Sequence, residues 1–282
     1  MTERSGKPSG RKRVTAKALA PEDRILPPAL TEATPATSTP AASALVPPAS
    51  IALQTSVPPA GALTTDATTQ VRQVTPSYWD DACRHLSKRD RMMRKLIPRY
   101  GEGRLQCRGD AFTTLARSIV GQQISVKAAQ AVWDRFAALM VRPAAHLTPA
   151  GVLGLEPGAA RAAGLSVRKV EYLLDLAAHF QSSAVHVGQW QEMDDEAIID
   201  ELVAIRGIGR WTAEMFLIFH LMRPDVLPLD DVGLLKGIGL NYFSGESVSR
   251  AEARDVAEAW VPFRSVATWY IWRSLDPLPV DY

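Results

Sequence analysis

The sequence is poor in cysteine, in long apolar runs and in net charge. Cys83 and Cys107 are its only cysteines, too few for an iron–sulfur cluster, a four-cysteine zinc site or a disulfide-stapled domain. No stretch of 18 apolar residues occurs, and no apolar segment follows the basic start of the chain, which argues against a membrane-spanning helix and a secretory signal. We therefore expect a soluble, intracellular protein without a membrane partner.

The small net charge of +2 over 282 residues is unevenly distributed. Residues 1–74 contain eight Lys or Arg against five Asp or Glu, whereas residues 75–282 contain 24 against 25. The larger part of the chain therefore lacks a global basic field that would attract a polyanion. Any contact with nucleic-acid phosphate must come from local geometry.

Residues 1–74 have the composition of a disordered segment. Ten of the twenty prolines lie within residues 1–59, and residues 25–70 contain only two charged side chains. Such a segment has too few periodic apolar residues to offset the entropy lost on ordering it. We predict a disordered Pro/Ala/Thr-rich tail over residues 1–74 and a folded domain over residues 75–282.

The folded part shows helical periodicity nearly everywhere and no convincing alternating strand pattern. Apolar residues recur at spacings of three and four along residues 128–139, 170–177 and 198–203, the period of an amphipathic helix. Glycine and proline separate these stretches at spacings typical of helix boundaries. The sequence predicts an all-α domain of eight to ten helices. The tryptophans that we assign to its core are Trp133, Trp190 and Trp260.

The segment LVAIRGIGRWTAEMFLIF, residues 202–219, combines two helical stretches with a short turn. Gly207 and Gly209 flank one aliphatic residue, and glycine permits the positive φ and the close backbone approach of a tight helix hairpin. Free backbone N–H groups near Gly207, Gly209 and Trp211 could then bind a DNA phosphate without side-chain charge. A plain structural hairpin is the alternative, because a Gly-Ile-Gly turn alone is a weak signal.

The segment DVLPLDDVGLLKG, residues 225–237, brings two adjacent aspartates to the start of an apolar helix. Aspartate is a preferred N-cap residue, and we expect Asp230 to fill that role. Asp231 would then project into a cleft, where the positive end of the helix favours its anionic form.

Three segments in this order resemble the helix-hairpin-helix (HhH-GPD) DNA glycosylases, and among them the DNA-3-methyladenine glycosylase II family. They are RSIVGQQISVKAA at residues 117–129, AIRGIGRWTAEMF at residues 204–216 and LPLDDVGLLKG at residues 227–237. The stretches at residues 161–177 and 260–272 support the resemblance, which covers about residues 78–278 in all.

The resemblance implies a bilobed helical glycosylase fold with a helix-hairpin-helix motif. One lobe would comprise residues 112–225, and the other residues 75–111 plus 226–282. The implied activity is hydrolysis of the N-glycosidic bond of alkylated bases, such as 3-methyladenine and 7-methylguanine, in double-stranded DNA. The abasic site left behind would pass to the downstream enzymes of base excision repair.

Four residues match the family's catalytic and base-binding positions. Asp231 matches the catalytic aspartate. Trp211 stands where bifunctional relatives carry the lysine that forms a Schiff base, so the resemblance implies no lyase activity. Trp211, Met215 and Trp272 match the walls of the base pocket, although Met215 replaces an aromatic residue of the best-known bacterial member.

Other matching positions imply contacts with DNA and with an ion. Gln122 and Ser125 lie in the segment near the minor groove, and Gln123 matches the wedge that fills the space left by the flipped nucleotide. The hairpin residues assigned to DNA binding are Gly207, Gly209, Arg210, Trp211 and Thr212. The family holds a monovalent cation, here a sodium or potassium ion, at hairpin carbonyls that match Val203, Ile205 and Gly207. No other cofactor is expected.

Two alternatives remain open at this point. The chain could be a non-catalytic DNA-binding protein that uses the hairpin alone, or a glycosylase for another damaged base. A binding protein should have the same affinity for intact and damaged duplex. In either case we expect a monomer, located in the cytoplasm with the nucleoid if bacterial and in the nucleus if eukaryotic.

Overall fold

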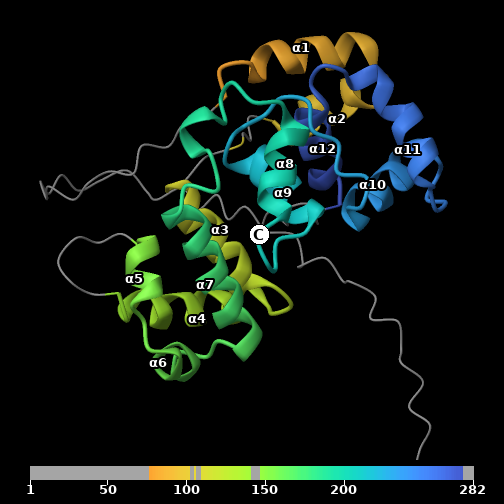
Figure 1. Ribbon diagram of the computed structural model, residues 1–282. Helices are drawn as coiled ribbons and strands as arrows, with labels where there is room; N and C mark the ends of the chain where they lie inside the picture. The colour runs from red at the N-terminus through yellow and green to blue at the C-terminus, as the bar shows by residue number, and fades with distance from the viewer. Residues whose placement is uncertain (1–75, 102–104, 106–108, 141–146, 276–282) are drawn as a thin grey trace, which may run out of the picture. The chain divides into compact units, whose positions relative to one another are not determined.

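The computed structural model describes residues 76–101, 105, 109–140 and 147–275. The predicted tail and Cys107 lie outside these residues. Every regular element within them is a helix, which confirms the all-α prediction for this part of the chain (Figure 1). None of these helices is long and apolar enough to cross a bilayer.

Twelve α-helices and two 3-10 helices occur in the described ranges. They are α1 (Trp79–Arg89), α2 (Met93–Tyr100), α3 (Ala111–Gly121), α4 (Val126–Ala138), α5 (Pro149–Leu153), α6 (Pro157–Ala162), α7 (Val167–Gln181), η1 (Val187–Gln189), α8 (Asp195–Val203), α9 (Arg210–Phe219), α10 (Val232–Tyr242), α11 (Arg250–Ala257), η2 (Glu258–Trp260) and α12 (Arg264–Arg273). The expected number of helices, eight to ten, was too low because it missed the short helices α5 and α6. Each of them begins with a proline, a residue suited to the first helical position.

Several helices begin with an N-cap residue whose side chain accepts a backbone hydrogen bond. Asp110 at α3, Ser125 at α4, Ser166 at α7 and Asp231 at α10 each accept a hydrogen bond from the backbone N–H three residues further on. The start of α9 differs, because its N-cap residue is Gly209. The first N–H groups of α9 therefore have no capping side chain and are left for another acceptor.

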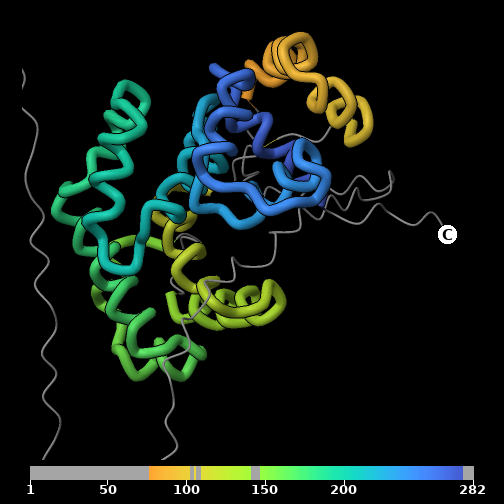
Figure 2. Tube along the Cα trace, turned by 90° about the vertical axis from the view of Figure 1, so that its right-hand side faces the viewer, coloured from red at the N-terminus to blue at the C-terminus, as the bar shows by residue number. Residues whose placement is uncertain are grey.

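The helices contact one another in a pattern that brings distant segments together. Helices α3, α4, α5 and α6 are linked through contacts of α3 with α4 and of α7 with α3, α5 and α6. Helix α12 contacts α1, α2 and α10, and the hairpin helices α8 and α9 contact each other (Figure 2). Helix α3 also contacts α9. The boundary between two lobes stays a prediction.

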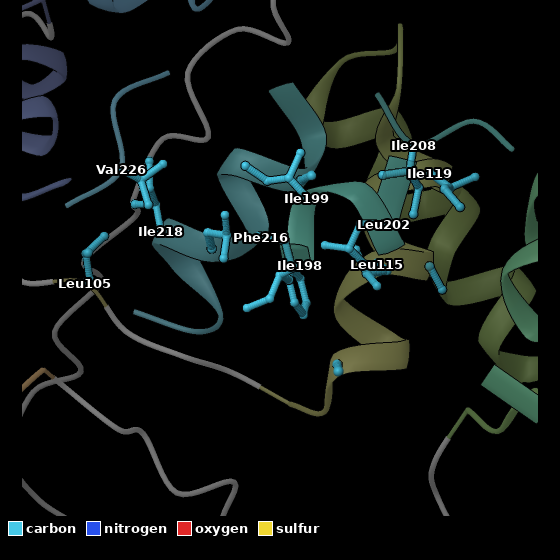
Figure 3. Close-up of a cluster of buried hydrophobic side chains, with 14 of the residues drawn as sticks. Leu105, Leu115, Ile119, Ile198, Ile199, Leu202, Ile208, Phe216, Ile218 and Val226 are labelled. Carbon is cyan, nitrogen blue, oxygen red and sulfur yellow. The ribbon is translucent and has the colours of Figure 1, made fainter. Parts of the chain in front are cut away.

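Apolar side chains of α3, α8 and α9 form one buried cluster around the hairpin. Figure 3 shows Ile208 of the hairpin turn beside Ile119 of α3, and Leu202 of α8 beside Leu115 of α3. All four are at most 4% exposed. Truncating a buried side chain of this kind costs about 1–5 kcal/mol. The cluster therefore fixes the end of α3 against the hairpin turn.

The three tryptophans assigned to the core are buried, with exposed fractions of 8%, 1% and 0% for Trp133, Trp190 and Trp260. The indole Nε1 of Trp190 donates to Glu201 at 2.9 Å, and that of Trp260 donates to Asp90 at 3.2 Å. A buried indole usually has such an acceptor. The core assignment is confirmed.

Candidate active site and DNA interface

Asp231 lies in the loop between α9 and α10 and is only 5% exposed. Its Oδ1 accepts hydrogen bonds from the backbone N–H of Leu234 at 2.5 Å and from Nε1 of Trp272 at 2.8 Å. Its Oδ2 accepts a hydrogen bond from Nε1 of Trp211 at 2.9 Å. Three donors from three helices thus fix the orientation of one buried carboxylate, and charge-assisted hydrogen bonds of this kind are the strong ones.

The expectation that Asp230 caps α10 is wrong. The N–H of Asp231 donates to the carbonyl of Pro228 at 2.9 Å, and this turn places Asp231, not its neighbour, directly before the first helical residue. Asp231 therefore caps the helix and meets the indoles with the same carboxylate. Asp230 is about half exposed and pairs with Arg250 at 2.6 Å.

An apolar wall stands beside Asp231. Trp211, Met215 and Phe219 follow one another at intervals of four residues on α9, which places them on one face of the helix. The ring of Phe219 stacks on Trp272 with a centroid distance of 5.7 Å and an interplanar angle of 12°. Phe219 is not among the predicted pocket residues, although it lies four residues after Met215 on α9 and stacks on Trp272.

Gly233 allows Trp272 to approach Asp231 closely. A Cβ added at Gly233 would lie 3.0 Å from Oδ1 of Asp231 and 3.4 Å from Cδ1 of Trp272. Only a residue without a side chain leaves this corner of the site undistorted. Gly233 is not among the predicted site residues, although it lies two residues after the catalytic candidate Asp231.

The hairpin turn has the geometry that its glycines predict. Gly207 has φ of +87°, and a Cβ there would meet the ring of Tyr172 at 2.3 Å. Gly209 has an ordinary φ, and a Cβ there would meet nothing within 4 Å. No acceptor within the described ranges bonds the backbone N–H of Gly207, Gly209 or Trp211. These N–H groups are therefore able to bind an anion from outside the chain.

Arg210 and Thr212, whose side chains are predicted to bind DNA beside these amides, have different surroundings. Arg210 donates to both carboxylate oxygens of Glu196 at 2.6 and 2.9 Å and to Glu214 at 3.1 Å. The hydrogen bonds that Arg210 donates to Glu196 raise the pKa of Arg210 above its usual value. Its charge is thus already balanced by two carboxylates. Thr212 lies half-buried in the first turn of α9.

The predicted wedge segment joins the end of α3 to the start of α4. Gln122 does not point away from the protein, since its Nε2 donates to the carbonyl of Gly207 at 2.8 Å. Gln123 is exposed and has φ of +59°, a conformation that few residues other than glycine adopt. Oγ of Ser125 caps α4 by accepting from Ala128 at 3.3 Å. The structure thus joins Gln122 to the hairpin and leaves Gln123 exposed.

The predicted cation ligands are the carbonyls of Val203, Ile205 and Gly207. The carbonyl of Ile205 accepts a hydrogen bond from the N–H of Ile208 at 3.1 Å, and that of Gly207 accepts one from Gln122. Each carbonyl oxygen has two lone pairs, so both retain one for an ion. The donor set fits a sodium or potassium ion, which stays a prediction.

A cavity of about 550 Å³ opens on another face of α9, away from Trp211 and Met215. Glu214 lines it, is 5% exposed and has an Oε2 atom without a hydrogen-bond partner in the described part of the chain. Burial raises the pKa of Glu214 to about 7, although Arg210 acts in the opposite direction. Asp231 does not line this cavity, so Glu214 is not part of the site around Asp231.

Known proteins resemble this chain in both sequence and fold. Residues 116–263 match the family model described as HhH-GPD superfamily base excision DNA repair protein. The chain is 31% identical over 194 residues to DNA-3-methyladenine glycosylase 1 of Schizosaccharomyces pombe, covering 67% of this chain and 85% of that protein.

Solved structures of DNA glycosylases have a similar fold. A DNA-3-methyladenine glycosidase from Bacillus halodurans superposes with a TM-score of 0.64 at 33% identity, covering 72% of this chain and 92% of that one. A 3-methyladenine DNA glycosylase of Schizosaccharomyces pombe, in complex with abasic DNA, gives a TM-score of 0.60 at 28% identity, covering 72% of this chain and 100% of that one.

Proposed function

Because this chain belongs to the HhH-GPD superfamily of base excision DNA repair proteins, we propose that it is a monofunctional DNA glycosylase of the 3-methyladenine type II class. Its substrates would be alkylated bases, such as 3-methyladenine and 7-methylguanine, in double-stranded DNA. The observation that carries the proposal is the buried carboxylate of Asp231, which two indole N–H groups hold beside an apolar wall.

The reaction begins with extrusion of the damaged nucleotide from the duplex, which costs a few kcal/mol and least for damaged pairs. The backbone N–H groups of Gly207, Gly209 and Trp211 bind the phosphates, and the exposed side chain of Gln123 fills the space left in the stack. Phosphate binding by backbone amides explains how residues 75–282, which carry no excess of basic side chains, hold a polyanion.

The extruded base binds against Trp272. Phe219 stacks on one face of this indole ring, and we place the base on the opposite face, which contacts no aromatic ring among the described residues. A base alkylated at a ring nitrogen is cationic, and a desolvated cation–π contact contributes about 2 kcal/mol. Because the edge of Trp272 donates to Asp231, stacking on the ring also brings the glycosidic bond close to the carboxylate.

Asp231 then stabilises the transition state. Breakage of the glycosidic bond leaves an oxocarbenium-like sugar, and the fixed, water-shielded carboxylate stabilises this positive charge and orients or deprotonates the attacking water. A cationic base departs as a neutral molecule, so no general acid is required.

The absence of lyase chemistry follows from Trp211. An indole nitrogen is not nucleophilic, because its lone pair is part of the aromatic system, and Nε1 of Trp211 donates a hydrogen bond to Asp231. It cannot form the Schiff base that lysine forms in bifunctional enzymes. The product is therefore an intact strand with an abasic site.

The test is incubation of the full chain with methylated duplex DNA and chromatography of the released bases. We expect free 3-methyladenine and 7-methylguanine, and strand breaks that appear only after treatment with alkali. Nicking without alkali would contradict the monofunctional assignment. Equal affinity for intact and damaged duplex, together with no released base, would instead identify a binding protein.

A further inference from the structure

The segment at residues 161–177 supports the family resemblance, but the proposed chemistry assigns it no task. Within it, Lys169, Tyr172 and Asp175 lie at intervals of three residues on α7, which places them along one side of the helix. Each of the three contacts a segment assigned to DNA binding. This stripe of α7 therefore joins two loops that are far apart in the sequence.

Lys169 holds the wedge segment. Its Nζ donates to the carbonyl of Val120 at 2.8 Å and to that of Gln122 at 2.8 Å. These carbonyls end α3, where the helix dipole is negative and the last carbonyls lack partners within the helix. No carboxylate within the described residues pairs with Lys169, so its charge is directed to these two oxygens.

Tyr172 and Asp175 hold the hairpin turn. The ring of Tyr172 occupies the space that a side chain at position 207 would need, and Oδ2 of Asp175 accepts from the N–H of Arg206 at 2.8 Å. The bond from Gln122 to the carbonyl of Gly207 then joins the two loops directly. The contacts form a closed ring of α7, wedge segment and hairpin.

The wedge segment needs such support because its backbone is strained. Gln123 has φ of +59°, a left-handed conformation that is unfavourable for a residue with a side chain. Without the contacts made by Lys169, the turn could relax and the side chain at position 123 would change direction. A wedge acts by filling a gap of defined position, so its direction matters.

We propose that Lys169 is a positioning residue for base extrusion: it fixes the direction of the Gln123 wedge relative to the phosphate-binding hairpin. This inference rests on the proposed function, since it concerns how the enzyme opens a duplex. Lys169 acts through the wedge and touches neither the base nor the sugar. Substitution of Lys169 should therefore lower the excision rate most for substrates whose base is hardest to extrude.

The experiment compares Lys169→Met with wild type on 7-methylguanine placed either opposite cytosine in a duplex or in an unpaired bulge, where extrusion costs little. Two hydrogen bonds from a charged group are lost, so the single-turnover rate in the duplex should fall at least about tenfold. The rate in the bulge should change less than about twofold. The fluorescence of 2-aminopurine beside the lesion should report slower extrusion in the duplex.

Arg168→Met is the matched control, because it removes one positive charge from the same turn of α7 at an exposed residue. It should leave both rates unchanged. Lys169→Arg, which can still donate to both carbonyls, should restore most of the duplex rate. If Lys169→Met does not fold, Lys169→Gln permits the same comparison. The glutamine amide can still donate a hydrogen bond, but the shorter side chain cannot reach both carbonyl oxygens.

Three results would overturn the inference. An equal loss of rate in duplex and bulge would indicate a general structural role, and no loss in the duplex would indicate no role. If Lys169→Met lowered the salt dependence of DNA binding by the equivalent of about one phosphate contact, Lys169 would be a direct phosphate ligand instead. If wild type itself releases no base, the proposed function is wrong, which is a separate outcome.

Discussion

The carboxylate of Asp231 is unusual in having an indole donor on each oxygen. A carboxylate that only caps a helix would be satisfied by the N–H of Leu234 and by water, yet Trp211 and Trp272 each contribute their Nε1. In the proposed mechanism both tryptophans thus have two tasks, because the ring would contact the base and the N–H orients the carboxylate. These tasks can be separated by replacing the indole with a phenyl ring.

Trp272→Phe keeps a ring that can stack on Phe219 but removes the donor to Oδ1 of Asp231. Loss of one hydrogen bond to a charged group should lower kcat about tenfold, whereas KM should change less than about threefold. Steady-state kinetics on a single-lesion duplex measures both constants.

Trp269→Phe is the matched control, since Trp269 lies in the same helix and its Nε1 has no hydrogen-bond partner in the part of the chain that the structure describes. It should leave kcat unchanged. If Trp272→Phe raised only KM, the indole would act through stacking alone, and its role in orienting Asp231 would be excluded.

Glu214 makes the stability of the fold depend on pH. Burial raises its pKa from 4.5 to about 7, so the folded chain holds this proton more tightly than the unfolded chain. The stabilisation is fully present below about pH 4.5 and is lost as the pH rises to about 7. The lack of a hydrogen-bond partner for Oε2 of Glu214 and the raised pKa have the same cause, because the carboxyl group is buried among too few hydrogen-bond donors.

Glu214→Gln removes this titration and should become more stable relative to wild type as the pH rises. Between pH 5 and pH 8 the difference in the free energy of unfolding should move by about 2 kcal/mol in favour of the variant. Urea unfolding at both pH values measures it. Glu258→Gln, an exposed residue that lines the same cavity, should show no such change; an equal change there would refute the assignment to Glu214.

At the scale of elements, the hairpin between α8 and α9 uses its two glycines for different purposes. Gly207 is required by the protein itself, because its φ is positive and Tyr172 occupies the space where a side chain would lie. Gly209 is not required by the fold, since a Cβ there would meet nothing. A bare backbone at Gly209 instead suits the close approach of a phosphate.

Alanine substitutions should therefore give opposite results. Gly207→Ala should lower the free energy of unfolding by at least about 2 kcal/mol, through backbone strain and the clash with Tyr172. Gly209→Ala should leave stability within about 0.5 kcal/mol and weaken the binding of duplex DNA. Thermal unfolding and fluorescence anisotropy with a short duplex distinguish the two effects. Normal DNA binding by Gly209→Ala would argue against a phosphate at this turn.

The sequence predicted these elements well where local chemistry decides the structure. Helical periodicity located the hairpin helices, and the turn from Arg206 to Gly209 followed from its two glycines. The choice of the capping aspartate was wrong because it depends on the turn from Pro228 to Asp231, not on residue preference. The hydrogen bond of Gln122 to Gly207 joins residues 85 positions apart, so no local sequence pattern could predict it.

At the scale of the whole molecule, charge does not explain DNA binding. The net charge of +2 arises from the tail, since residues 75–282 carry 24 basic and 25 acidic residues. The best basic candidate in the hairpin, Arg210, is already paired with Glu196 and Glu214. We therefore propose that backbone amides, together with a wedge positioned by α7, are the main means by which the chain binds and opens a duplex.

Removal of residues 1–74 should accordingly leave catalysis intact. At physiological salt, where charges more than about 8 Å apart are screened, the single-turnover rate on a short duplex should stay within about threefold of that of the full chain. At low salt the full chain should bind more tightly, because the tail carries an excess of three positive charges. Loss of base excision on deletion would show that the tail belongs to the catalytic unit.

The proposed base excision depends on Asp231, and single-turnover release of 7-methylguanine by Asp231→Asn tests this role, with Asp230→Asn as the control. The two residues are adjacent, but Asp231 is buried and held by the indoles, whereas Asp230 is exposed and pairs with Arg250. We predict that Asp231→Asn lowers the rate at least roughly a hundredfold and that Asp230→Asn leaves it nearly unchanged. Equal rates for wild type and Asp231→Asn, with both variants folded, would contradict the catalytic role of Asp231.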